Sequence, residues 1–116
     1  MIRDDLVYLE HILDCLKKIQ EYSLNIELKE FIQNSLIQDA IIRKFEVIGE
    51  ATKNISQGLK SSNSNLSWVD MARMRDKLIH HYFDVDLNIL WDTIHNDVPI
   101  LLVAIQTIIN EFADNK

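Results

Sequence analysis

The sequence predicts an all-α protein, an antiparallel bundle of about four long helices plus a short one. Only two glycines and one proline occur among 116 residues, whereas strand-rich folds need many turns. Apolar residues recur at three- and four-residue spacing through most of the chain, which is the pattern of helices with one buried face. A chain of this length supports one hydrophobic core, so we expect a single domain over residues 1–116.

The first third of the chain predicts two helices. A long helix is expected over residues 2–22, because its leucines recur at helical spacing: Leu6, Leu9, Leu13 and Leu16. Asn25 follows this segment, and its side-chain oxygen can cap the N-terminus of a helix. We therefore expect a second, short helix near residues 27–34.

A third helix is expected over residues 37–56, followed by the clearest loop in the sequence. The inward face of this helix is predicted from its apolar residues: Ile37, Ile41, Phe45, Ile48 and Ile55. Gly49 lies inside the helix and has no side chain, which predicts that another backbone segment approaches it closely. Residues 56–65 are rich in serine and asparagine, so we expect a turn-forming loop there.

The second half of the chain predicts two more helices. One should begin after Ser67, whose hydroxyl is a good N-cap, and run to about Phe83. Asp84 or Asp86 then caps a long final pattern of apolar residues: Leu87, Leu90, Trp91, Ile94, Val98, Leu101, Ile105, Ile108 and Phe112. Pro99 cannot donate a hydrogen bond to the carbonyl four residues earlier, so we expect a kink at this point.

Composition narrows the class of protein. The chain is 47% hydrophobic and 26% charged, as ordinary globular proteins are. The single cysteine, Cys15, excludes an internal disulfide and a cysteine-based zinc site, and it suits a reducing cytoplasm. We expect it to pack as a small apolar group in the first helix. Residues 1–23 are amphipathic and carry several acids, unlike a signal peptide. The apolar run over residues 98–109 is too short for a membrane span, so we expect a cytoplasmic protein that does not engage a membrane.

The net charge of −6 argues against a general nucleic-acid binder, which is usually basic. Residues 67–83 are an exception, because they carry three basic and two acidic side chains and form the net-positive stretch of the chain. An enzyme that holds a short single-stranded segment needs only a local positive cleft. The acidic remainder suits solubility or a basic protein partner.

The most informative segment covers residues 75–82, which contain Arg75, His80 and Tyr82 at fixed spacing. The planar fork of donors on an arginine can hold a phosphate, and its charge cannot be lost. Histidine is the side chain best suited to exchange protons near neutral pH. Together these two groups are sufficient for phosphodiester cleavage without a metal. No carboxylate–histidine cluster has the spacing of metal ligands, so we expect neither a metal nor a cofactor.

Helical geometry makes the position of Arg75 unusual. On a continuous helix to Phe83, Arg75 lies in the middle of a broad apolar arc, so its charge must be paired, hydrogen-bonded or turned toward a second protein surface. His80 lies about 140° around the same helix. Three arrangements can bring the two groups together: a wrapped arginine side chain, a locally distorted helix, or two chains that contribute one motif each. We favour the third, which predicts a homodimer.

The pattern of an arginine, four residues, a histidine, one residue and a tyrosine, with the polar Asp76 after the arginine, resembles the HEPN ribonucleases. It is most similar to the HepT toxins of prokaryotic toxin–antitoxin pairs, and residues 42–51 extend the resemblance over most of the chain. The resemblance implies a HEPN-like helical bundle and metal-independent cleavage of RNA, in which the ribose 2′-hydroxyl attacks the adjacent phosphate. It implies that Arg75 holds the scissile phosphate and that His80 moves the proton as general base or acid.

The resemblance also implies a partner and a form of control. HepT toxins are paired with minimal nucleotidyltransferase antitoxins, which transfer AMP to the tyrosine of the motif, here Tyr82. Asp76 lies four residues before His80 and is expected to orient the imidazole and raise its pKa. Arg73 is a candidate RNA contact. Two further polar residues, Arg43 and Glu50, share a face of the third helix, and whether they serve the site or only each other stays open from the sequence.

Each of these residues has a structural alternative. Arg75 can form a structural ion pair, Asp76 and His80 can be solvated surface groups, and Tyr82 can fill the apolar arc. The corresponding alternative function is a non-catalytic helical module that binds a nucleotidyltransferase partner or a nucleotide. A purely structural adaptor is a third possibility, but it leaves a charged residue on an apolar face unexplained. Because Arg75 and His80 are both present, the sequence favours the enzyme.

Overall fold

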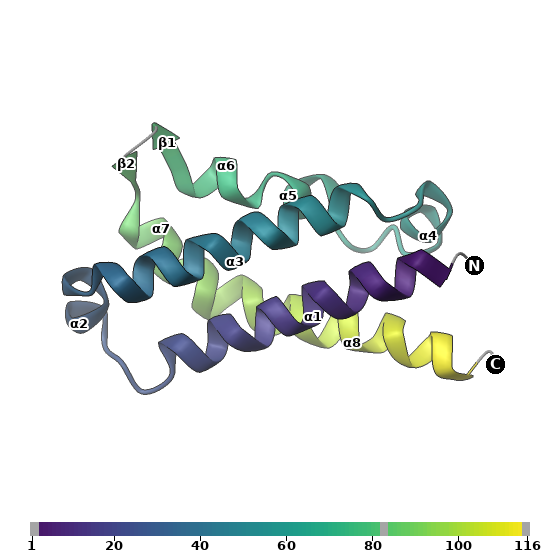
Figure 1. Ribbon diagram of the computed structural model, residues 1–116, viewed down its shortest axis with the longest axis horizontal. Coiled ribbons are helices and arrows are strands. Elements are labelled where there is room, and N and C mark those ends of the chain that lie inside the picture. The colour runs from purple at the N-terminus through teal and green to yellow at the C-terminus, as the bar shows by residue number, and fades with distance from the viewer. Residues whose placement is uncertain (1–2, 82–83, 115–116) are drawn as a thin grey trace.

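Three long helices form the body of the molecule. The structure is a computed structural model and describes residues 3–81 and 84–114. Helices α1 (Arg3–Ser23), α3 (Ser35–Lys53) and α8 (Val98–Asp114) lie along its long axis, and α1 runs antiparallel to the other two (Figure 1). Helix α1 packs against both α3 and α8. The prediction of an all-α, antiparallel helical bundle is confirmed.

The hydrophobic core lies between these helices. The apolar side chains with no exposed surface on α1 and α3 are Leu9, Ile12, Leu16, Ile19, Ile41, Phe45 and Ile48. Cys15 is buried among them, as predicted. Helix α3 begins two residues earlier than expected, because the side chain of Asn34 accepts a hydrogen bond from the backbone N–H of Ile37 and caps the helix.

The connection between α1 and α3 contains the short helix α2 (Leu28–Gln33). This helix was predicted, but its cap was assigned to the wrong residue. Glu27 occupies the N-cap position without a side-chain hydrogen bond, and Asn25 instead adopts a φ of 60° in the turn that leaves α1. Asparagine is among the few residues that enter this left-handed region readily, so Asn25 forms the turn instead of capping the helix.

The segment predicted to be a loop contains a further helix, α4 (Gln57–Ser62). Ser56 caps it by accepting a hydrogen bond from the N–H of Leu59, whose side chain is buried. Asp5 on α1 accepts hydrogen bonds from Ser56, at 2.8 Å from the backbone nitrogen and 2.6 Å from the hydroxyl oxygen. The loop prediction is therefore wrong over α4, because one buried leucine and one cap suffice to form a helical turn there.

The helix predicted to run from Ser67 to Phe83 is broken, and this prediction is wrong. Helix α5 (Trp68–Ala72) and helix α6 (Met74–Leu78) are separated at Arg73, and Ser67 makes no side-chain capping hydrogen bond. The chain then forms strand β1 (Ile79–His81), which pairs antiparallel with β2 (Asp84–Val85).

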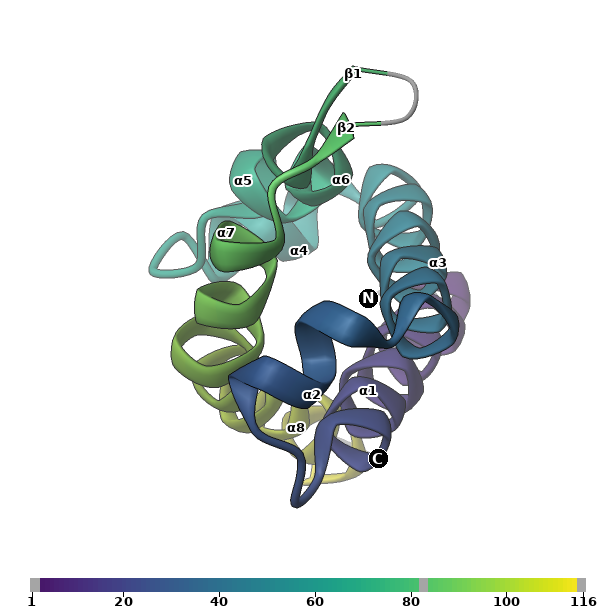
Figure 2. The same ribbon diagram turned by 90° about the vertical axis from the view of Figure 1, so that its left-hand side faces the viewer.

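The break at the end of α6 has a physical cause. Residues 79–83 are β-branched or aromatic, and such side chains lose more freedom in a helix than in a strand. The N–H of Asp86 donates to the carbonyl of Leu78 at 3.1 Å, so the end of α6 gains a partner from across the hairpin. Figure 2 shows the two strands projecting beyond α6, away from the body of the bundle.

The last part of the chain is nearly continuous helix. Helix α7 (Leu87–Asp92) is capped by Asp86, one of the two predicted caps, because its carboxylate accepts from the N–H groups of Asn88 and Ile89. A π-helical turn, η1 (Thr93–Asp97), joins α7 to α8. We expected a kink at Pro99, and the structure has the π-helical turn η1 just before it. Pro99 has no N–H, so the carbonyl four residues earlier cannot accept the usual helical hydrogen bond from it. None of the described helices is long and apolar enough to cross a bilayer.

Candidate functional site

Arg75 lies on α6 and forms ion pairs with two carboxylates. Its Nε lies 3.9 Å from Oε2 of Glu46 on α3, and its Nη1 lies 3.7 Å from Oδ1 of Asp76. The side chain is 46% exposed. Of the three alternatives that the sequence left open for this charge, the structure shows pairing. Because the pairs are long and partly exposed, they fix the direction of the guanidinium more than they stabilise the fold.

Gly49 makes the approach of α5 and α6 to α3 possible. A Cβ atom placed on Gly49 would lie 3.0 Å from the carbonyl oxygen of Ala72, at the end of α5. This confirms the predicted close approach of a second backbone. The glycine therefore lets the chain that carries Arg75 lie directly over the charged face of α3.

A small cavity of about 100 Å³ opens beside Arg75. It is lined by three basic residues, three acidic residues and two small ones: Arg43, Lys53, Arg75, Glu46, Glu50, Asp76, Gly49 and Ala72. Arg43 and Glu50 therefore line the same cavity as Arg75, and Glu50 pairs with Lys53 instead of Arg43. Sequence reasoning assigned no role to Glu46 and Lys53. Their three- and four-residue spacing from Arg43 and Glu50 was the signal that places all four on one face of α3.

Asp76 contacts Arg75, and its predicted contact with His80 stays untested. The Asp76 side chain is 72% exposed. The backbone of His80 lies in β1, but its side chain and the whole of Tyr82 lie outside the described residues. The roles predicted for His80 and Tyr82 therefore remain predictions.

The structure corrects the helical placement of His80 relative to Arg75. Helix α6 ends at Leu78, so a separation of about 140° on one regular helix does not apply to these residues. The alternative in which Tyr82 fills the apolar arc assumed the same continuous helix. Of the three arrangements considered, the structure shows the locally distorted helix, and the contribution of a second chain stays a prediction.

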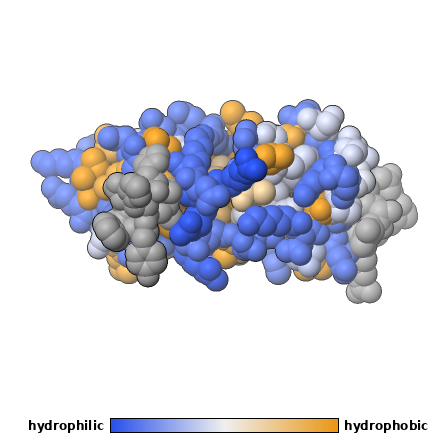
Figure 3. All heavy atoms as spheres, turned by 90° about the horizontal axis from the view of Figure 1, so that it is seen from above, coloured by the Kyte–Doolittle hydropathy of each residue, from blue (hydrophilic) through white to orange (hydrophobic). Residues whose placement is uncertain are grey.

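Arg73 and Lys77 extend the basic character of this face. Arg73 is exposed at the junction of α5 and α6, next to two larger cavities. Lys77 pairs with Asp97 at 3.7 Å, which ties α6 to the π-helical turn. Figure 3 views the molecule from the side on which α5 and α6 lie, and it shows a mainly hydrophilic surface. Within residues 3–81 and 84–114, no group of three or more His, Cys, Asp or Glu side chains has a metal-binding arrangement.

Comparison with known proteins gives consistent matches. Residues 12–108 match the model of a family described as HepT-like, ribonuclease HepT-like. A protein of Thermococcus cleftensis named "Probable ribonuclease HepT" is 45% identical over 94 residues, which cover 81% of this chain and 86% of that protein. A Caldanaerobacter subterraneus protein, provisionally named as an RNase, is 36% identical over 104 residues, or 90% of this chain and 93% of that protein.

A third relative is longer than this chain. It is a Methanocaldococcus jannaschii protein whose name joins a gamma-glutamylcyclotransferase to a provisionally assigned RNase. It is 38% identical over all 116 residues of this chain, which spans about half, 52%, of that protein. No solved structure matches the chain significantly.

Proposed function

The chain belongs to the HepT-like ribonuclease family, and from this premise we propose that it is a toxin endoribonuclease that cleaves RNA without a metal. The observation that carries the proposal is the position of Arg75. It is half exposed, held by Glu46 and Asp76, and lies on the short helix that leads directly into the strand containing His80. A guanidinium held in this way keeps N–H donors for a phosphate.

The proposed reaction is an internal transesterification. A general base removes the proton from the ribose 2′-hydroxyl, and the 2′-oxygen forms a bond to the adjacent phosphorus. The bond from phosphorus to the 5′-oxygen breaks, and a general acid returns a proton to that oxygen. The products are a 2′,3′-cyclic phosphate and a 5′-hydroxyl. His80 moves the proton, and Arg75 stabilises the charge that develops on the phosphate.

Cleavage of RNA in the presence of EDTA tests this proposal. The wild-type protein should cleave RNA under these conditions, whereas Arg75→Ala and His80→Ala should lose about 10²–10⁴-fold in rate. Lys29→Gln is a control for the loss of a positive charge, because Lys29 is exposed on α2 and does not line the cavities around Arg75 and Arg73. If the two motif variants remain folded and cleave at the wild-type rate, these residues are not catalytic.

Control by AMP transfer is the second part of the proposal. A partner nucleotidyltransferase would transfer AMP from ATP to the hydroxyl of Tyr82 and release pyrophosphate. The added phosphate would then compete with RNA for Arg75. After incubation with the partner and ATP, the intact mass of the wild-type protein should rise by AMP-sized steps, while that of Tyr82→Phe should not change. Modification of Tyr82→Phe at another residue would exclude Tyr82 as the control site.

A homodimer is the third part of the proposal. Helices α5 and α8 expose large apolar side chains, namely Val69 (61% exposed), Ile100 (69%) and Val103 (65%), which suits a surface covered by a second copy. Sedimentation should then give twice the chain mass of 13.6 kDa. Charged substitutions at Ile100 and Val103 should yield a monomer. A wild-type protein that sediments as a strict monomer would contradict this part.

A further inference from the structure

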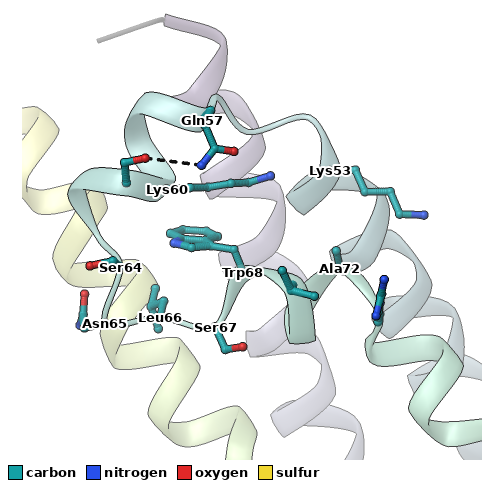
Figure 4. Close-up of a pocket in the computed structure, with 12 residues that line it drawn as sticks. Lys53, Gln57, Lys60, Ser64, Asn65, Leu66, Ser67, Trp68 and Ala72 are labelled. Atoms are coloured by element: carbon teal, nitrogen blue, oxygen red, sulfur yellow. Dashed lines mark hydrogen bonds between the residues drawn. The ribbon is translucent and has the colours of Figure 1, made fainter.

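A larger cavity, which we call the α4 pocket, lies next to the candidate site and has no role in the proposed cleavage chemistry. Its volume is about 820 Å³, within the range of ligand-binding pockets. The residues that line it come from the end of α3, from α4, from the connection after it, and from α5: Lys53, Gln57, Lys60, Ser61, Ser64, Asn65, Leu66, Ser67, Trp68, Val69, Ala72 and Arg73. Figure 4 shows Lys60 extending across this pocket above the ring of Trp68.

The charge of the α4 pocket distinguishes it from the other cavities of the described chain. Lys53, Lys60 and Arg73 line it, and no acidic residue does. The cavity beside Arg75 has three basic and three acidic residues, and the cavity between α5 and η1 has two of each. Lys53 pairs with Glu50 at 3.3 Å, but neither Lys60 nor Arg73 forms an ion pair with an acidic residue of the described chain. In a protein of net charge −6, such a pocket is suited to an anion.

The remaining lining residues suit a nucleotide better than a simple anion. Five of them are neutral side chains that donate and accept hydrogen bonds: Gln57, Ser61, Ser64, Asn65 and Ser67. The indole of Trp68 is fixed as a wall, because its Nε1 donates to the carbonyl of Asn63 at 3.0 Å. Hydroxyl and amide groups can bind ribose and base edges, while the three cations can bind phosphates.

The α4 pocket adjoins the cavity that holds Arg75. Lys53 and Ala72 line both cavities. A strand of RNA whose scissile phosphate lies at Arg75 can therefore pass over Lys53 and enter the α4 pocket. A free mononucleotide has the same chemistry, but it does not explain why the two cavities share a basic residue.

We propose that the α4 pocket is a second RNA subsite, which binds the phosphates of nucleotides beside the cleaved bond through Lys53, Lys60 and Arg73. This inference rests on the proposed ribonuclease function. It assigns the pocket a role in holding the RNA strand and none in the chemical step. The subsite should therefore contribute to the affinity for RNA and to its dependence on salt.

Binding of a labelled single-stranded RNA tests the subsite apart from cleavage. The measurement uses full-length protein carrying His80→Ala, so that RNA is not consumed, and it is repeated over a range of salt concentrations. Each lost phosphate contact should reduce the slope of log K against log salt by about 0.7 and weaken binding about four-fold at roughly 0.15 M salt. Lys60→Gln should show one such loss, and Lys60→Gln with Arg73→Gln should show two. Lys29→Gln, which makes the same charge change on α2, should show none.

The outcomes separate this subsite from the proposed function. If wild-type protein does not cleave RNA but Lys60→Gln still weakens binding, the ribonuclease assignment fails and the RNA subsite stands. If cleavage is confirmed and Lys60→Gln binds RNA with the wild-type affinity and salt slope, the subsite is refuted. Displacement of the RNA from the pocket by AMP at equal affinity would also refute it, because it would show a free-nucleotide site. Pocket variants that changed only the interaction with the nucleotidyltransferase would refute it as well.

Discussion

Replacing Gly49 by alanine tests the close packing of α5 on α3. The new Cβ would lie 3.0 Å from the carbonyl oxygen of Ala72, while ordinary carbon–oxygen contacts are about 3.3 Å or more. The neighbouring atoms are backbone, at the end of α5, so they cannot move aside as a flexible side chain can. Relief requires a shift of the whole short helix by a few tenths of an ångström, and overpacking of this kind costs about 1–3 kcal/mol.

The intrinsic preference of alanine for helices opposes this cost. Alanine is more favourable than glycine inside a helix by about 0.5–1 kcal/mol. The net effect of Gly49→Ala should therefore be a loss of about 1 kcal/mol in the free energy of unfolding. For a domain of this length, that loss lowers Tm by about 4 °C.

Gly58 provides a matched control, because it is the other glycine of the chain and lies in α4. Apart from its chain neighbours and the backbone of its own helix, no atom lies within 4 Å of a Cβ placed there, and its φ is not positive. Gly58→Ala should therefore raise the free energy of unfolding by about 0.5 kcal/mol. Thermal and urea denaturation of both variants measure the difference. If Gly49→Ala were as stable as Gly58→Ala, the inferred contact between α3 and α5 would be wrong.

Three further changes have defined outcomes. Glu46→Gln should alter the free energy of unfolding by no more than about 1 kcal/mol, because the ion pair with Arg75 is exposed. The same change should lower kcat about ten-fold, because the guanidinium of Arg75 is no longer held in place. Glu50→Gln, which removes the same charge from the same cavity but pairs with Lys53, should leave kcat nearly unchanged. Burial raises the pKa of the Cys15 thiol, so the thiol ionises at lower pH in the unfolded chain than in the folded one. The wild-type protein should therefore lose stability relative to Cys15→Ala as the pH rises above about 8.5. A stability difference that urea denaturation shows to be independent of pH would contradict this.

Local signals in the sequence predicted much of the fold correctly. The apolar spacing of α1, α3 and α8, the burial of Cys15 and the cap at Asp86 each depend on residues within a few positions of one another. Gly49 is a partial exception, because the sequence predicted that another backbone segment approaches it closely but did not identify that segment. The structure supplies that partner as Ala72.

The errors lie where distant segments decide the local structure. Residues 79–81 continue the helical pattern of apolar residues in the sequence, but their backbone pairs with residues 84–85 and forms a strand instead. Helix α4 forms from a local cap, but its attachment to α1 through Asp5 joins segments that are far apart in the chain. The pairing of Arg75 with Glu46 likewise joins two helices whose relative position no spacing rule gives. The sequence therefore identified Arg75 but not Glu46, the α3 carboxylate with which it pairs.

The hydrogen bonds between Asp5 and Ser56 have a consequence for the order of folding. Ser56 uses one hydroxyl both to cap α4 and to reach a carboxylate 51 residues away, near the start of α1. Closing so long a loop carries an entropic cost that local helix formation does not. Helix α4 can therefore take its final orientation only after α1 and α3 have docked, and the pocket it borders is completed late. Refolding of a Trp91→Phe variant, in which Trp68 is the remaining tryptophan, would report this late step through its fluorescence, separately from the formation of the long helices.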